Sequence, residues 1–426
     1  MIPTHPLRAT LHNEIHARPP EALARRVSVL HLVMLANPEE RRASRAHLER
    51  LLADSHAPRP AAEDGHFRAD LPGYRIRWEQ HTEFVSWTFF RVLDEHFPVL
   101  ERLASAKDVI PAEWLAELPG QALCKIELAA VPLAVMRERI PERARFDEAT
   151  LVGARVLGEQ AEVLTDFQIH SDGFTRFLVG MAPTMPPRQR GRLVQSLLEV
   201  ETYRMMGLLG LPVARQAGPI LAQAERDLAE LAEAIRAAER ETEAQLLDRL
   251  TRLAATVESL YATTHSRFSA TQAYFELVDK RLAFLGESKL GSLPTLGAFV
   301  ERRVAPARST CAWTAHRLDL LSQRISRMSN LLRTRVEIDQ QQSSRDLLSA
   351  MNARQRLQLK LQTAVEGLSV AAISYYIVGL IAYAADGLVK LGWPYSAKVT
   401  AAASIPVVVL GVAWSMRRLH KRLLRD

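Results

Sequence analysis

The hydrophobic and polar positions follow different patterns in the two halves of the chain. Before about residue 185, short runs rich in β-branched and aromatic residues alternate with stretches of helical periodicity. The runs that predict strands are 27–35, 74–92 (one long strand or a hairpin), 122–133, and 156–181, which holds at least one strand. The stretches that predict helices between them are 38–55, 97–106 and 140–149. Strands alternating with helices indicate an α+β or mixed α/β domain built on one sheet.

After about residue 187 the pattern becomes almost wholly helical. An amphipathic helix is predicted over 188–209, then a boundary marked by glycine and proline, then a long charged helix over 222–265 that continues to 285. Gly291 to Thr295 break the pattern, and from Gly297 a helix resumes with no clear stop before an apolar region. At a rise of about 1.5 Å per residue this helix extends for roughly 130 Å. Such a length favours packing against the preceding helix and bundling with other subunits.

Two apolar stretches near the C-terminus predict a membrane hairpin. Neither 367–385 nor 399–416 contains a charged side chain, and each is close to the length of about 20 residues that spans a bilayer. We expect glycines at close helix contacts, a proline kink, interfacial tryptophans and basic residues behind the second span. These residues are Gly367, Gly379, Pro406, Trp393, Trp414, Arg417 and Arg418. The alternative is a buried helical hairpin of a soluble protein, in which the flanking basic clusters would have no purpose.

Basic residues lie before the first span of the hairpin and after its second span. Arg354, Arg356 and Lys360 precede the first span and a basic tail over 417–426 follows the second, whereas the loop over 386–398 carries two lysines and one aspartate. The positive-inside rule therefore predicts cytoplasmic termini and an outer loop. No apolar signal segment opens the chain, and its alanine-, arginine- and leucine-rich usage suits a GC-rich bacterium. We expect a bacterial inner-membrane protein whose bulk is cytoplasmic, with the lipid bilayer as a partner.

Composition narrows the classes of function. The chain has 426 residues and a formal net charge of +7, and its length allows two soluble parts beside the anchor. The basic excess lies partly beside the predicted membrane, and no basic stripe is interleaved with stacking aromatics, so nucleic-acid binding is not expected. Cys124 and Cys311 match no metal or redox spacing and are expected to be buried thiols in a reducing compartment. The predicted domains are a cytoplasmic α/β domain over 1–187, a helical stalk over 188–360, the transmembrane hairpin over 361–416 and the tail over 417–426.

The N-terminal segment is one candidate ligand site. His12 and His16 would share a helical face, with Glu14 between them. This HxExH spacing could offer metal ligands, but it is not the HExxH arrangement of zinc enzymes. The sequence favours the alternative of a capping or docking segment whose polar groups pair with neighbouring backbone. The chain also has no P-loop, no GxGxxG after a strand, no GxSxG elbow and no CxxC. An enzyme is therefore not predicted, and neither is a cofactor.

Two polar motifs at predicted strands form the other candidate site. Alternate residues of an extended strand face one side, which groups the polar residues of 79–83 on one strand and those of 166–172 on another. If these strands are neighbours, two histidines and several carboxylates converge and could bind a divalent metal or an anionic small molecule. The candidate ligands are His81, Glu83, His170 and Asp172. A solvated sheet face with cross-strand charge pairs is the alternative that the sequence favours.

Several motifs resemble those of an uncharacterised bacterial family. HPLR at 5–8 and NEIHARPP at 13–20 resemble the opening of the domain of unknown function 3422, a family described as predicted membrane-anchored proteins. HTEF at 81–84 and DFQIHSDGF at 166–174 fit the same family. The resemblance covers the whole chain. It implies a membrane-anchored protein and brings no known reaction.

The predicted build also resembles, more loosely, that of the CorA-type divalent-cation channels. Those channels are oligomers with a cytoplasmic α/β domain, a long stalk helix, two C-terminal spans and a Gly-Met-Asn motif at the outer end of the first span. Here the corresponding residues 383–388 read YAADGL, so the resemblance implies a shared build without magnesium transport. The leading hypothesis is a non-enzymatic, membrane-anchored homo-oligomer that acts as a scaffold or sensor, with unknown protein partners. A CorA-like cation channel or transporter is the alternative, and a membrane-tethered hydrolase is a third class.

Overall fold

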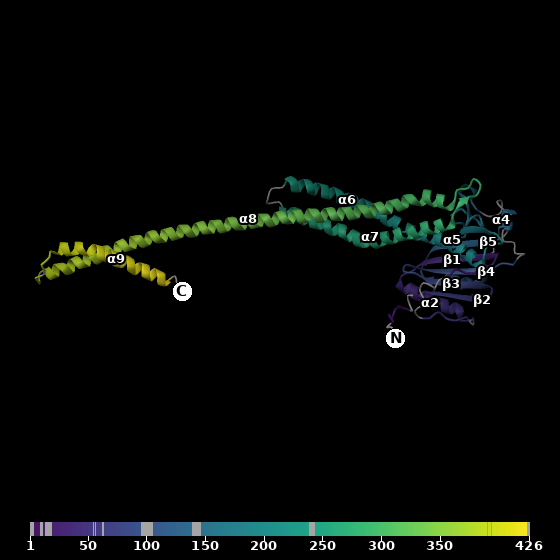
Figure 1. The fold of residues 1–426 in the computed structure, drawn as a ribbon, viewed down its shortest axis with the longest axis horizontal. Coiled ribbons are helices and arrows are strands. Elements are labelled where there is room, and N and C mark those ends of the chain that lie inside the picture. The colour runs from purple at the N-terminus through teal and green to yellow at the C-terminus, as the bar shows by residue number, and fades with distance from the viewer. Residues whose placement is uncertain are drawn as a thin grey trace. The chain divides into compact units, whose positions relative to one another are not determined.

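The computed structural model describes residues 4–8, 12, 19–53, 55, 57–61, 64–94, 105–138, 146–237, 243–389, 391–392 and 394–423. They form two units, of which the first contains 1–236 and 248–328 and the second contains 237–247 and 329–426. The fold is mixed α+β, with a sheet in the first unit and long helices toward the C-terminus (Figure 1).

A nine-stranded sheet, counted over the described residues, forms the core of the first unit. Its strands lie in the order β2 (His66–Leu71), β3 (Tyr74–Gln80), β4 (Phe84–Val92), β1 (Val27–Leu35), β5 (Gln121–Pro132), β8 (Thr175–Met181), β7 (Ala161–Thr165), β6 (Val152–Val156) and β9 (Ser288–Lys289). Neighbouring strands are antiparallel except β5 and β8, which are parallel. β1 pairs with β4 and β5 along its whole length and is buried up to its last residue. A strand covered on both faces reads as a continuous apolar run, which is why VSVLHLVML predicts it.

Helices α2 (Pro38–Leu52) and α5 (Pro187–Leu208) cover opposite faces of the sheet. Successive residues of β1 point to opposite faces, and Leu30 packs with Leu48 of α2 in one core. Val29 packs with Leu197 of α5 in the other core. Both cores exclude water from large side chains, as the fully buried Trp78 on the α2 side illustrates.

The described helices agree in most places with the periodicity of the sequence. The short helices are η1 (Ala106–Val109), α3 (Ala112–Ala116), α4 (Leu133–Glu138) and η2 (Glu148–Thr150). The long helices that follow α5 are α6 (Gly210–Ala237), α7 (Glu243–Leu285), α8 (Leu296–Val389) and α9 (Ala397–Leu423). The prediction of one helix over 222–265 is wrong, because α6 ends at Ala237 and α7 begins at Glu243. Apolar spacing continues on both sides of this break, so periodicity alone does not reveal it.

The other predicted elements divide into confirmed, missed and undescribed ones. Most of the sequence predictions of these elements are confirmed. They are the strands within 27–35 and 122–133, the hairpins within 74–92 and 156–181, the helices of 38–55 and 188–209, and the break at 291–295. Strands β2, β6 and β9 are not among the sequence predictions. The predicted helices over 97–106 and 140–149 lie mostly outside the described residues.

The second unit contains the C-terminal part of α8 and all of α9. Both helices are long and apolar enough to cross a membrane, with a mean hydropathy of 1.8 in the richest window of each. A Cβ added to Gly367 or Gly379 would meet no atom within 4 Å, so the predicted close contacts at these glycines are not made within the described chain. Pro406 lies inside α9. The guanidinium of Arg418 lies 5.0 Å from the ring centre of Trp414, and Trp393 lies outside the described residues.

Both cysteines are free thiols buried in the first unit, as the sequence predicts for Cys124 and Cys311. Burial raises the pKa of each thiol above its ordinary value, and most strongly for Cys124. Neither thiol therefore has the features of a reactive nucleophile, which needs a lowered pKa and access to solvent.

Candidate functional site

The two polar motifs occupy connections between strands, at separate places on the sheet. His81 and Glu83 lie in the turn between β3 and β4, and His170 and Asp172 lie in the loop between β7 and β8. The prediction of extended strands is wrong here, because β3 ends at Gln80 and β7 ends at Thr165. The condition for the two histidines to converge, that their strands are neighbours, is not met, because β4, β1 and β5 separate β3 from β8.

Metal binding stays a prediction at all of these residues. No group of three or more histidine, cysteine, aspartate and glutamate residues with the geometry for a metal ion occurs in the part of the chain that the structure describes. His12 is exposed, and His16, the other member of the proposed pair, lies outside the described residues.

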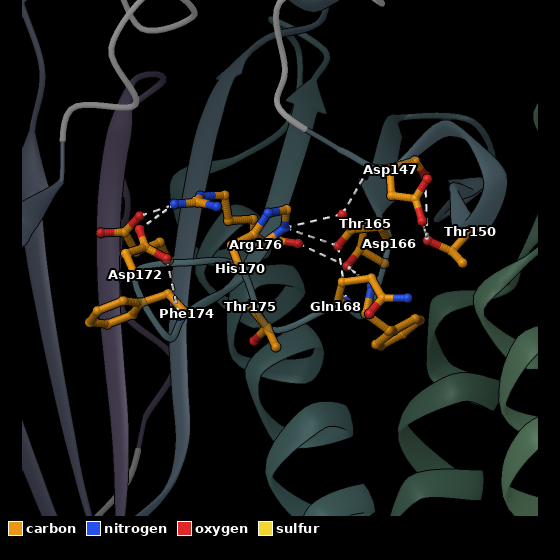
Figure 2. A network of polar contacts seen from close by, with 12 residues as sticks. Asp147, Thr150, Thr165, Asp166, Gln168, His170, Asp172, Phe174, Thr175 and Arg176 are labelled. Carbon is orange, nitrogen blue, oxygen red and sulfur yellow. Dashed lines mark hydrogen bonds and ion pairs between the residues drawn. The ribbon is translucent and has the colours of Figure 1, made fainter.

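Asp166 organises the loop between β7 and β8 (Figure 2). Its side chain is almost fully buried, and its carboxylate accepts hydrogen bonds from the backbone N–H of Gln168 at 3.0 Å and of Asp147 at 3.1 Å. His170 Nε2 lies 3.1 Å from the same carboxylate. A buried carboxylate that accepts several hydrogen bonds fixes the conformation of the loop around it. The imidazole of His170 is therefore held in one orientation.

Arg176 is the charged centre on the other side of this loop, and Figure 2 shows its side chain reaching toward Asp172. The guanidinium is buried and pairs with the Asp172 carboxylate, and its Nε lies 3.7 Å from Glu127. Burial raises the pKa of Glu127, while Arg176 opposes that rise. Asp172 thus has an internal partner, which makes a structural role for it the simpler interpretation.

The pair formed by His170 and Asp166 has the form of an acid–base unit, in which a carboxylate orients an imidazole. Such a unit needs a nucleophile or a substrate within reach of the imidazole. Within the described ranges, the imidazole of His170 makes no hydrogen bond to a hydroxyl or thiol group. The geometry therefore orients the imidazole of His170 without placing a described nucleophile beside it.

Phe167, in the same loop, is a residue that sequence reasoning missed. Its φ of 52° lies in the left-handed region, which is uncommon for a side chain of this size. Its ring stacks on Phe299 of α8 at a centroid distance of 4.6 Å, and the guanidinium of Arg204 lies 5.3 Å from its centre. These contacts tie the loop to α5 and α8. A left-handed phenylalanine has no signal in the sequence, because its conformation is imposed by the packing around it.

The turn between β3 and β4 is tied to α7. The carboxylate of Glu83 accepts a hydrogen bond from Tyr274 Oη at 2.9 Å and pairs with Arg267. Burial, together with the hydrogen bond and charge of Glu83, raises the pKa of the Tyr274 hydroxyl. The ring of His81 stacks on Phe84 at 4.2 Å, and its backbone N–H donates to the Phe84 carbonyl at 2.8 Å. Glu83 therefore has partners within the protein, and the neighbouring His81 borders an open space.

That open space is a groove with a cavity volume of about 880 Å³. Its walls come from α2, the residues just before β2, the turn between β3 and β4 with the adjoining strand ends, α5 and α7. All of the groove therefore belongs to the first unit. Sequence reasoning named His81 as a candidate ligand but missed Arg41, Arg42 and Arg45, which line the same groove. The available signal was the cluster of arginines in PEERRASR, at the start of the helix predicted over 38–55.

Comparison with known proteins identifies the family. The model of the family described as protein of unknown function (DUF3422) matches residues 3–423. The protein belongs to this family, which confirms the predicted family resemblance over nearly the whole chain. No curated protein and no solved structure matches the chain. The looser likeness to CorA-type channels and the bacterial origin stay predictions.

Proposed function

We propose that the protein is a membrane-anchored homo-oligomer that acts as a scaffold or sensor and catalyses no reaction. The observation that carries this proposal is the apolar surface of the C-terminal hairpin. Leu380, Val407 and Leu410 are 67%, 72% and 71% exposed, and they lie in stretches without charged side chains. Soluble proteins rarely expose contiguous apolar surface of this kind. A lipid bilayer is the solvent that such a surface suits.

Flanking charges support an orientation for this anchor. Exposed Arg354, Arg356 and Lys360 precede the first apolar stretch in α8, and Arg417 and Arg418 follow the second in α9. Basic residues concentrate on the cytoplasmic side of membrane helices. We therefore propose an inner-membrane location in which both ends of the chain are cytoplasmic and the loop over 386–398 is outside.

The exposed middle of α8 supports self-association. Every residue over 340–365 is exposed, and a helix without packing partners gains little stability from its own hydrogen bonds. Leu357, Leu361 and Val365 follow one another at intervals of four residues and are 59%, 61% and 62% exposed. This spacing places them on one face of the helix. The same face of a second copy is a partner of matching length and chemistry.

Extraction and mass measurements test the two parts of the proposal separately. We expect the full-length protein to remain in membranes washed with alkaline carbonate. We also expect the protein mass of its detergent-solubilised particle, with the bound detergent subtracted, to exceed the 47.7 kDa of one chain. Replacing Leu357 and Leu361 by aspartate should lower the particle mass. Replacing Asn352 and Thr363, which are exposed, polar and on the opposite side of the helix, by aspartate is the matched control and should not. Release by carbonate contradicts the anchor, and a single-chain mass contradicts the oligomer.

The cation-channel alternative stays a prediction, because no contact within the described ranges specifically favours it. The same purified particle tests it when it is reconstituted into liposomes. Flux of a divalent cation through an assembled oligomer would favour the channel, and the scaffold or sensor role predicts no flux.

A further inference from the structure

We propose that the groove beside α2 is a binding site for a phosphate-bearing anion, held by Arg41, Arg42 and Arg45. The three residues lie in the first turns of α2 and line the groove together with His81. Residues 41 and 45 are one helical turn apart and therefore lie on the same side of the helix. This site belongs to the first unit and does not depend on the membrane proposal.

Neutral carbonyl groups position two of these arginines. Arg41 Nη1 donates to the carbonyl oxygens of Thr82 at 2.6 Å and of Ala36 at 3.0 Å. Arg45 Nη2 donates to the carbonyl oxygen of Asp64 at 2.5 Å, and its guanidinium lies 5.4 Å from the ring centre of Trp78. Carbonyls and aromatic rings orient a guanidinium without cancelling its charge. These two side chains are therefore already ordered before a ligand binds.

The described residues that line the groove carry more positive than negative charge, with three arginines and one aspartate. Over the described residues, no carboxylate forms an ion pair with Arg41, Arg42 or Arg45, whereas the buried Arg176 of this unit has carboxylate partners. Asp64 also lines the groove, and its carboxylate accepts a hydrogen bond from the backbone N–H of Ala61 at 2.8 Å. Neighbouring like charges on a helix are destabilising by themselves. An anion bound in the groove would remove that repulsion.

The shape and chemistry of the groove favour phosphate over a single carboxylate. Several guanidinium groups match a group that carries more than one negative charge and several acceptor oxygens. The cavity volume of about 880 Å³ is within the usual range for small-molecule sites and leaves space beyond one phosphate. Phe84, Tyr203 and Leu277 supply apolar surface on the remaining walls for the organic part of a ligand. A free phosphorylated molecule and a phospholipid headgroup share this chemistry.

A charge-reversal series tests the site in the full-length protein. The protein is placed in nanodiscs of zwitterionic phosphatidylcholine, and binding of inorganic pyrophosphate is measured by titration calorimetry. We expect Arg42→Glu to weaken binding at least about tenfold, because an exposed cation becomes an anion beside the ligand. Arg303→Glu is the matched control, since it makes the same change of net charge on an exposed residue of the same unit outside the groove, and it should change the affinity less than about twofold. Arg42→Gln, which adds no negative charge, should weaken binding by an intermediate factor.

A second series of nanodiscs distinguishes the two sources of phosphate. If the ligand is a soluble molecule, anionic phosphatidylglycerol in the nanodisc leaves the affinity for pyrophosphate unchanged. If the ligand is a headgroup, the anionic lipid competes and lowers that affinity in the wild type but not in Arg42→Glu. The proposal is overturned if the wild type binds no pyrophosphate, or if Arg42→Glu and Arg303→Glu weaken binding equally.

Discussion

Tyr274 Oη donates a hydrogen bond to the Glu83 carboxylate across 2.9 Å, between residues that are 191 positions apart in the chain. This contact fixes the turn between β3 and β4 against α7. Arg267 pairs with the same carboxylate, so one acidic side chain joins two residues of α7 to the edge of the groove. The turn is therefore positioned by side chains as well as by the sheet.

Removing the contact between Tyr274 and Glu83 should lower the free energy of unfolding, and the effects of changing the two residues should be coupled. We expect Tyr274→Phe to lower the free energy of unfolding by about 1 kcal/mol, because Glu83 loses one hydrogen bond while remaining partly solvated. Glu83→Gln should cost somewhat more, because the ion pair with Arg267 is lost as well. Urea unfolding of both variants and of the double variant measures the coupling.

Tyr261→Phe is the matched control on the same helix, since the hydroxyl of Tyr261 makes no hydrogen bond to another described residue. It should leave the urea midpoint unchanged. Strictly additive effects of Tyr274→Phe and Glu83→Gln would show that the two side chains do not interact in solution.

Acid should destabilise the sheet through His31. Its imidazole is buried between the hydroxyl oxygens of Thr88 at 2.8 Å and Thr202 at 3.2 Å, and burial lowers its pKa to about 4. In the unfolded chain a histidine binds its proton near pH 6.5. Between about pH 6.5 and 4 the unfolded state therefore holds a proton that the folded state excludes, and stability falls as the pH falls. The free energy of unfolding decreases over this pH window by an amount on the order of 3 kcal/mol.

Comparison with His31→Gln isolates that contribution. Glutamine can hydrogen-bond to both threonines but does not titrate, so the variant should lose less stability than the wild type between pH 7 and pH 4.5. All other titrating groups are common to the two proteins. Equal acid sensitivity of the two proteins in urea unfolding would exclude His31 as the cause.

Gly191 in α5 should not tolerate a side chain. A Cβ at this position would lie 1.7 Å from the backbone oxygen of Glu21, and the Glu21 carboxylate is itself held by Arg68 and Arg75. We expect Gly191→Ala to lower the free energy of unfolding by about 3 kcal/mol, because backbone atoms must move.

A second glycine in a helix provides the control for this substitution. A Cβ at Gly218 in α6 would meet no atom within 4 Å. The helix propensity that alanine adds is opposed by crowding of its Cβ against the ring of the following Pro219, so Gly218→Ala should change the free energy of unfolding by less than about 1 kcal/mol. Thermal or urea unfolding measures both variants. Similar effects of the two substitutions would mean that α5 does not approach Glu21 as described.

One charge inside the apolar part of α9 should weaken membrane insertion. Val407→Asp places a carboxylate near the middle of the second apolar stretch, where the cost of inserting an aspartate is about 3 kcal/mol. We expect a smaller carbonate-resistant fraction for this variant. Thr363→Asp, on the exposed part of α8 before the first stretch, should behave as the wild type does. Unchanged extraction of Val407→Asp would argue against a bilayer around α9.

The elements that the sequence predicts correctly are those whose own residues determine them. β1 is a run of apolar residues with one histidine, and α2 begins at Pro38 behind Asn37, whose side chain accepts hydrogen bonds from the backbone N–H groups of Glu39 and Glu40. Local chemistry of this kind is readable without the fold.

The candidate site was less predictable because it depends on which segments become neighbours. His81 and His170 have similar polar surroundings in the sequence, yet three strands separate β3 from β8. Strand order arises from packing of the whole sheet, and no residue of either motif encodes it. Tyr274 illustrates the same limit, because α7 follows the turn by almost two hundred residues and only the folded chain brings them together.

The burial of both cysteines has a practical consequence for spectroscopy. Thiol-directed probes react with the thiolate, and burial raises the pKa of Cys124 and Cys311 and shields both from reagents. A cysteine introduced at an exposed site, such as position 303 or 357, should therefore be labelled selectively in an otherwise native chain. Pairs of spin labels or fluorophores placed in this way would measure distances between the two units directly.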